Sequence, residues 1–110
     1  MASYLKNEVV LVRYPFSDLS NTKVRPAIVV NDPHESQDFF IVPLSSRSGN
    51  LLRGEFILND WEEAGLNVSS SVKRGIYTVL DTLIIKKIGT LSERDAQQLD
   101  RSIREWLGVV

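Results

Sequence analysis

Hydrophobic residues in the first half of the chain occur in short runs that polar, turn-forming segments separate. The runs are rich in Val, Ile and Phe, which favour β-strands. They are Glu8–Tyr14, Arg25–Asn31, Asp38–Leu44 and Leu52–Leu58. The segments between them, such as the polar loop Ser17–Lys23, are too short for the crossover helices that parallel strands require. The pattern therefore predicts an antiparallel sheet, whose first strand ends at Pro15 because proline has no amide proton for the ladder.

The second half of the chain mixes helical and strand patterns. Asn59 and Glu62 have the spacing of a capping box, and Gly65 follows where a short helix would end. We therefore expect a short helix near residues 59–65. Two further apolar runs, Val72–Leu80 and Leu83–Ile88, are typical of strands on either side of a turn.

The C-terminal segment predicts an amphipathic helix near residues 92–107. Ser92 is a suitable N-cap, and Asp95 lies at the third helical position, where a carboxylate favours the helix dipole. Apolar residues then recur at three- and four-residue spacing. They are Ala96, Leu99, Ile103, Trp106 and Leu107. The predicted class is α+β, with one small antiparallel barrel-like sheet. Because so small a sheet cannot cover the face of Leu99, Ile103 and Trp106, we expect a homodimer.

Composition restricts the protein to a few classes. The chain has 110 residues, enough for a single domain over residues 1–110, and 43% are hydrophobic and 25% charged, as in soluble globular proteins. No apolar run approaches the ~20 residues of a membrane helix and the start has no apolar signal core, so we expect a cytoplasmic protein with no membrane association. The absence of cysteine excludes disulfides and thiolate metal sites, and one histidine leaves little for a zinc site.

The charge distribution is more informative than the net charge of −1. Residues 39–54 carry two arginines and no acid, and residues 64–92 carry four basic residues against Asp81 alone. The acidic residues concentrate near residues 60–63 and in the C-terminal stretch. This distribution fits a basic face on a neutral body, and it fits scattered solvated charges equally well.

Three stretches follow one another along the chain: VVLVRYPFSDLSNTKVRPAIVVN, FIVPLSS and DTLIIKKIGTLSERD. Together, in this order, they resemble the MazF/PemK family of toxins. The resemblance implies a small SH3-like barrel with appended helices. It also implies a type II toxin that cleaves single-stranded RNA by attack of the 2′-OH, without a metal or other cofactor. The partners that it implies are a second copy of the chain and a cognate antitoxin with a disordered acidic tail.

The resemblance assigns catalysis to Arg25 and Ser45. A guanidinium can bind two phosphate oxygens and stays charged, which suits the negative charge that develops on the phosphorus. A serine hydroxyl can donate to the scissile phosphate or relay a proton. The residues alone would favour a structural role for Arg25, as one partner of an ion pair at the start of a strand. Ser45 would be an ordinary serine at the end of a strand.

RNA contacts are expected from polar and basic side chains near these two. They are Lys23, Ser46, Arg47, Lys73 and Arg74. The general base stays unassigned, because the Lys73-Arg74-Gly75 stretch lacks the carboxylate that some plasmid-borne family members carry there. His34 is chemically suitable but lies in a turn between two predicted strands. Solvated strand-edge charges are the alternative for Lys73 and Arg74. Base stacking is also considered for the aromatic residues Trp61, Trp106, Phe39 and Phe40, for which core or dimer packing is the favoured alternative.

Two other functions stay open. The first is a gyrase poison of the CcdB type, a related fold whose activity depends on a C-terminal tail that begins with Trp-Gly; the sequence Trp106-Leu107-Gly108 is only superficially similar. The second is an inactive barrel that serves as a binding module.

Overall fold

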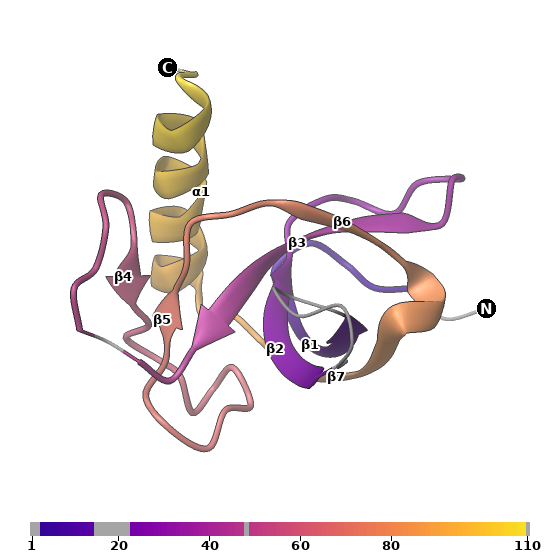
Figure 1. Ribbon diagram of the computed structural model, residues 1–110, viewed down its shortest axis with the longest axis horizontal. Coiled ribbons are helices and arrows are strands. Elements are labelled where there is room, and N and C mark those ends of the chain that lie inside the picture. Colours follow the sequence, from indigo (N-terminus) through magenta and orange to yellow (C-terminus); the bar gives the residue numbers. More distant parts are fainter. Residues whose placement is uncertain (1–2, 15–22, 48, 110) are drawn as a thin grey trace.

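The computed structural model describes residues 3–14, 23–47 and 49–109. These residues form seven strands, one turn of 3-10 helix and one α-helix (Figure 1). The elements are β1 (Glu8–Tyr14), β2 (Lys23–Val29), β3 (Asp38–Ser45), β4 (Phe56–Ile57), β5 (Ser71–Val72), β6 (Tyr77–Leu80), η1 (Asp81–Leu83), β7 (Ile84–Thr90) and α1 (Glu93–Leu107). The polar loop predicted at Ser17–Lys23 lies outside the described residues except for Lys23, the first residue of β2.

All the strand pairs are antiparallel, in the order β4-β5-β3-β2-β1-β7, with β6 also paired to β3. One face of the sheet buries a cluster that β1, β2, β3, β6 and β7 all contribute to, so the sheet curls around it. Its fully buried members include Val10, Val12, Val29 and Ile41. The pairings among the described residues do not join β7 to β4, and closure into a barrel therefore stays a prediction.

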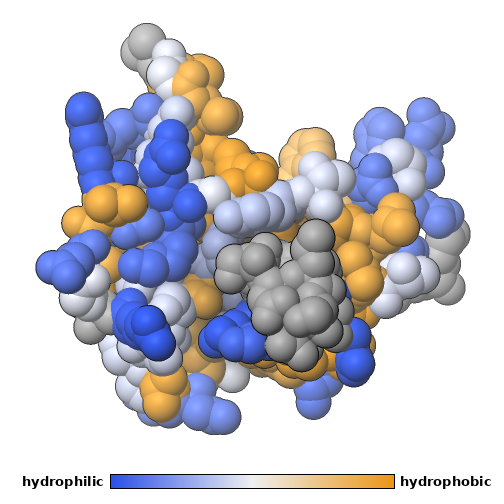
Figure 2. Space-filling view, viewed as in Figure 1, coloured by the Kyte–Doolittle hydropathy of each residue, from blue (hydrophilic) through white to orange (hydrophobic). Residues whose placement is uncertain are grey.

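Helix α1 and the segments around β4 and β5 cover the opposite face of the sheet. A second buried cluster lies here and includes Val9, Ile28 and Val42 of the sheet and Leu99 of α1, which is 1% exposed. Ala96, Ile103 and Trp106 of α1 pack against this cluster. Figure 2 shows hydrophobic residues along one side of this helix and hydrophilic residues along the other. The predicted apolar stripe therefore packs within the subunit, apart from Leu107, which is 61% exposed. The surface that we expected a second copy to cover is largely buried already.

The predicted short helix near residues 59–65 is wrong, because this segment forms consecutive turns. Asn59 does not cap it. Its amide group and its backbone N–H both donate to Asp95 Oδ1, at 3.1 and 3.0 Å, and the N–H of Asp60 donates to Asp95 Oδ2 at 2.9 Å. A seven-residue segment is also too short for a stable helix, because only a few of its residues could form helical hydrogen bonds.

The other strand predictions hold with changed bounds. The second strand begins two residues earlier than predicted, at Lys23, and the fourth shrinks to the two residues of β4. The run Val72–Leu80 divides into β5 and β6, which pair with different parts of β3. Between them, the backbone N–H of Arg74 donates to the Glu55 side chain at 2.8 Å. Helix α1 begins as predicted, with Ser92 Oγ accepting from the N–H of Asp95. Among the described residues, no helix is long and apolar enough to cross a membrane.

Candidate active site

The site lies where β2 and β3 stop pairing. The last pair of this ladder is Ala27 with Pro43. In the same register, the next pair would be Pro26 with Leu44, and it would need an amide proton that Pro26 does not have. The two strands therefore continue past Pro26 without pairing. Beyond this break, Arg25 on β2 and Ser45 at the end of β3 line the same opening.

A cavity of about 420 Å³ occupies this opening, and both Arg25 and Ser45 line it. Its floor follows one row across three strands, because Pro26 pairs with Leu11 on β1 and Leu11 pairs with Lys86 on β7. Lys86 thereby brings a second positive charge to the cavity.

The segment around Gly65 forms the opposite wall of this cavity. Gly65 has φ +84°, and a Cβ atom there would lie 1.9 Å from the carbonyl oxygen of Ile88. A Cβ on Gly89 would in turn lie 2.3 Å from the backbone of Ala64. Glycine at both positions lets this segment lie directly against β7, so that Asn67 and Ser70 also line the cavity.

A second cavity of about 390 Å³ adjoins the first and shares four residues with it. The shared residues are Arg25, Leu44, Ser45 and Ser46. The second cavity adds Pro43, Arg47 and Lys73. Arg25 and Ser45 are therefore reached from both cavities. The structure brings together five of the seven predicted site residues at this opening.

Hydrogen bonds from Ser71 and within the turn hold the backbone around Ser45. Ser71 on β5 is fully buried, and its Oγ donates to the carbonyl oxygen of Arg47 at 2.7 Å and to that of Ser45 at 3.4 Å. The backbone N–H of Arg47 donates to Ser45 Oγ at 3.1 Å. The Ser45 hydroxyl thus accepts one hydrogen bond from the turn and keeps its own proton to donate.

The described side chains that line the site are mainly basic or uncharged. Arg25, Arg47, Lys73 and Lys86 line the two cavities, and none of the lining residues that the structure describes is Asp, Glu or His. The cavities thus offer a polyanion several cations. The arrangement can bind a phosphate with Arg25 and donate a hydrogen bond to it from Ser45.

Lys73 meets its carboxylate partner away from these cavities. Its Nζ lies 3.5 Å from Glu55 Oε1, and the Glu55 side chain is only 5% exposed. Burial raises the pKa of Glu55, but hydrogen bonds from the N–H groups of Arg74 and Leu52 and the charge of Lys73 outweigh it and leave this pKa below its usual value. Glu55 therefore stays ionised, and it holds the Lys73 side chain and the backbone N–H of Arg74 in place.

Two predicted RNA contacts lie elsewhere. Arg74 lines a separate cavity with Trp106. Lys23 is exposed at the start of β2, on the same face of the strand as Arg25, but lines none of these cavities. His34 is exposed in its turn, with Nδ1 2.8 Å from Ser36 Oγ, and is not at the opening. Of the aromatic residues, Phe39 is buried, and Trp61 packs against the core.

Three further residues of the site were not predicted as functional. Lys86 could have been found from the alternation along Ile84–Thr90, which puts it on the same side of β7 as Ile88. Ser71 and Glu55 act through contacts with residues 24 and 19 positions away, to Arg47 and Arg74, which no local pattern indicates.

Comparison with known proteins identifies the family. A family model described as "PemK-like, MazF-like toxin of type II toxin-antitoxin system" matches residues 6–107. The chain belongs to this toxin family. The resemblance found in the sequence is thereby confirmed, since the match includes all three stretches that carry it. No curated protein matches the chain in sequence.

Solved structures of MazF-like toxins share the fold at low sequence identity. A MazE–MazF complex from Deinococcus radiodurans is 15% identical, with a TM-score of 0.79, covering 99% of this chain and 100% of that one. An endoribonuclease in complex with its cognate antitoxin, from a mycobacterial species, is 14% identical, with a TM-score of 0.75 and coverage of 100% and 98%. The Mycobacterium tuberculosis toxin MazF-mt6 is 16% identical, with a TM-score of 0.73 and coverage of 94% and 98%. The MazF-like fold therefore extends over nearly the whole chain.

Proposed function

We propose that this MazF-like toxin is an endoribonuclease that cleaves single-stranded RNA without a metal. The observation that carries the proposal is that Arg25 and Ser45 meet at one opening between β2 and β3, whose described lining is basic and free of acids. Family membership supports the same activity, because a solved relative is named an endoribonuclease.

The proposed reaction is transfer of the RNA phosphodiester within one strand. The 2′-hydroxyl loses its proton as its oxygen attacks the adjacent phosphorus, and the bond to the 5′-oxygen breaks as that oxygen gains a proton. The products carry a 2′,3′-cyclic phosphate and a 5′-hydroxyl. Arg25 binds two non-bridging oxygens as their charge increases. Ser45 donates a hydrogen bond to the same phosphate. Ser46, Arg47, Lys23 and Lys73 contact the flanking phosphates and riboses, which fix the strand without reading its bases.

Incubating the purified protein with a mixed-sequence RNA in EDTA tests this activity. We expect cuts at a short recurring sequence, with a cyclic phosphate on each 5′ fragment. Intact RNA together with inhibited DNA supercoiling by gyrase would favour a gyrase poison instead. Intact RNA with neither activity would favour an inactive binding module. In both cases the proposed function would be wrong.

The toxin is also proposed to be a single domain whose sheet curls into an SH3-like barrel, and to act in the cytoplasm.

We further propose that the toxin is a homodimer. Support for the dimer comes from large apolar side chains that stay exposed near β6 and at the end of α1. They are Ile76, Tyr77, Leu80, Leu107 and Val109. A second copy would remove them from water. A monomeric mass by light scattering at micromolar concentration would contradict the dimer.

The proposed protein partner is an antitoxin with a disordered acidic tail, which would fold onto the basic opening and block it. Two of the solved relatives are complexes with an antitoxin. We expect expression of the toxin alone to arrest growth, and a neighbouring reading frame to relieve the arrest. Harmless expression of the soluble, intact chain would count against the proposal.

A further inference from the structure

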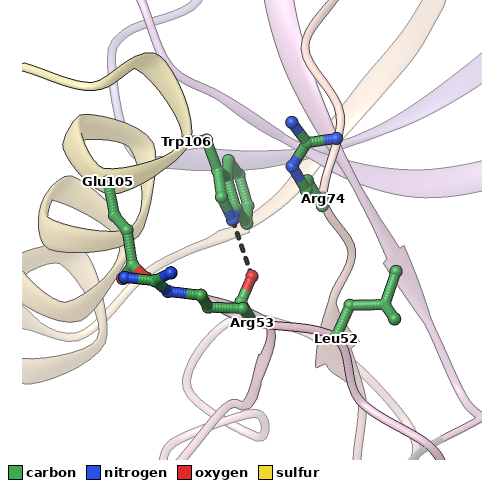
Figure 3. A pocket seen from close by; sticks show the side chains of 5 residues that line it. All are labelled: Leu52, Arg53, Arg74, Glu105 and Trp106. Atoms are coloured by element: carbon green, nitrogen blue, oxygen red, sulfur yellow. Dashed lines mark hydrogen bonds and ion pairs between the residues drawn. The ribbon is translucent and has the colours of Figure 1, made fainter.

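A cavity of about 480 Å³ lies between the C-terminal end of α1 and the segments that precede β4 and follow β5. Its lining residues are Leu52, Arg53, Arg74, Glu105 and Trp106, all drawn in Figure 3. None of the five lines the cavities at Arg25 and Ser45. The catalytic role proposed above therefore does not explain this cavity.

The indole ring of Trp106 is held in place at this cavity from two sides. Its Nε1–H donates to the carbonyl oxygen of Arg53 at 3.1 Å (Figure 3). A Cβ on Gly54, which has φ +86°, would lie 2.3 Å from the same nitrogen, so the ring can take this position only because residue 54 is glycine. The buried Ser102 hydroxyl fixes the turn by donating to the carbonyl oxygen of Gly54 at 2.7 Å. A rigid aromatic ring on a fixed turn suits stacking.

The charges around this indole are mainly basic. Arg53 pairs with Glu105, and these two charges largely cancel. Arg74 supplies the remaining charge, and no ion pair of its side chain is found with the described residues. Figure 3 shows its guanidinium on the same side of the cavity as the indole. An aromatic ring beside an arginine provides a stacking surface for a base and a cation for the neighbouring phosphate.

The backbone connects this cavity directly to the proposed active site. Lys73 lines the cavity at Arg25, and the next residue, Arg74, lines the cavity at Trp106. Glu55 holds both, through Lys73 Nζ at 3.5 Å and the N–H of Arg74 at 2.8 Å. An RNA strand that contacts Lys73 in the Arg25 cavity would therefore have a second basic contact at the next residue of the protein, Arg74.

We propose that the cavity at Trp106 and Arg74 is a second subsite for single-stranded RNA, which stacks one base on the indole and binds the adjacent phosphate through Arg74. The proposal rests on the ribonuclease function proposed above, and it names the nucleotides flanking the cleaved bond as the ligand. The subsite contributes affinity rather than chemistry, because its cavity is separate from the one at Arg25 and Ser45. Base stacking also tolerates any sequence, so the subsite does not select a base.

Trp106 fluorescence tests this subsite in the intact protein. The W61F variant leaves Trp106 as the one tryptophan, and a twelve-nucleotide 2′-O-methyl RNA cannot be cleaved because it has no free 2′-OH. We expect this oligonucleotide to quench Trp106 saturably, and R74A in the same background to weaken binding several-fold. R101A, the control, removes an arginine of α1 that hydrogen-bonds to Gln98 and should leave the binding unchanged.

Cleavage kinetics separate this subsite from the proposed catalysis. In the otherwise unchanged protein, W106L should raise KM for a sixteen-nucleotide RNA by roughly 5- to 100-fold and leave kcat unchanged, because it removes a stacking surface. W106F should restore most of the affinity. Cleavage without quenching, or an unchanged KM in W106L, would overturn the subsite and leave the ribonuclease intact. Quenching without cleavage would support the subsite and contradict the ribonuclease. Quenching by an alternating Glu-Leu peptide but not by RNA would assign the cavity to a protein partner and overturn the proposal.

Discussion

The hydroxyl of Ser71 donates a 2.7 Å hydrogen bond to the carbonyl oxygen of Arg47, and this contact fixes the turn that follows Ser45. Ser71 is fully buried and lies opposite Ser45 in the β3–β5 pair. The position of the proposed catalytic hydroxyl therefore depends on a residue that does not itself line either cavity at the opening.

Replacing Ser71 with alanine should affect stability and activity together. The change removes the part-buried hydrogen bond to the carbonyl oxygen of Arg47, which costs about 0.5–1.5 kcal/mol in the free energy of unfolding. We expect kcat for RNA to fall even where the variant is fully folded, because the Ser45 turn is less well fixed. Urea denaturation and single-turnover cleavage on one preparation measure both effects.

The variant Ser92→Ala is the control for Ser71→Ala. Ser92 is also buried, but its hydroxyl caps α1 by accepting from the N–H of Asp95, and it lines neither cavity at the opening. We expect it to lower stability and to leave the cleavage rate per folded molecule close to that of the wild type. Equal loss of rate in both variants would mean that Ser71 has no special role in placing Ser45.

Asp95 should be among the residues most important for stability. Its carboxylate is fully buried and accepts hydrogen bonds from the N–H groups of Asn59 and Asp60. Asp95→Ala leaves these donors unpaired, and we expect the free energy of unfolding to fall by about 2–4 kcal/mol. Ser92→Ala, which removes the N-cap of the same helix, should cost only about 1 kcal/mol. If the two variants unfold at the same urea concentration, the bridge from α1 to residues 59–60 contributes little.

This contact also illustrates where prediction from the sequence succeeds and where it fails. Strand β1 and helix α1 are predicted with nearly correct bounds, since Glu8, Pro15 and Ser92 mark their ends by local chemistry. The false helix at residues 59–65 has equally good local chemistry. In the structure the Asn59 side chain donates to Asp95, 36 residues further along the chain, and no local pattern indicates this contact.

In the candidate site, too, some features could be predicted from the sequence and others depend on contacts that the sequence does not indicate. Arg25 and Ser45 could be proposed because the family resemblance names both positions, and the break at Pro26 explains in physical terms why they meet. The separation of Arg74 from Lys73 could not be predicted. The two residues are adjacent in sequence, but they line different cavities because Glu55 binds one by its side chain and the other by its backbone.

The pair of Asp60 and Arg94 should make stability depend on acidity. Arg94 Nε and Nη2 each lie 2.7 Å from an oxygen of Asp60. Hydrogen bonds from Arg94 and, second, from Ser92 lower the pKa of Asp60 from 3.8 to about 2. Because the pKa is lower in the folded state, the stabilisation is complete above pH 3.8 and is lost as the pH falls towards 2.

Urea denaturation of the wild type and Asp60→Asn across this range tests that dependence. The wild type should unfold at the higher urea concentration near pH 6, and the difference should shrink between pH 4 and pH 2. Asp100→Asn, which breaks the exposed pair with Arg104 on α1, is the control and should show a smaller difference near pH 6. A difference that stays constant down to pH 2 would show that the charge of Asp60 is not its source.

Arg25 provides the most direct test of the proposed mechanism. If its guanidinium binds the phosphate as charge develops, Arg25→Ala should lower kcat by roughly 10²–10³, or ~3–4 kcal/mol, and weaken RNA binding far less. Arg25→Lys should recover little activity, because an ammonium keeps the charge but cannot form two parallel hydrogen bonds. Arg101→Ala is the control: it removes an exposed arginine of α1 and should leave the rate unchanged. The rate is to be measured with saturating RNA, beside the melting temperature of each variant. A variant at position 25 that melts several degrees lower but cuts RNA at the original rate per folded molecule would make Arg25 a structural residue, and the opening between β2 and β3 would lose its proposed role.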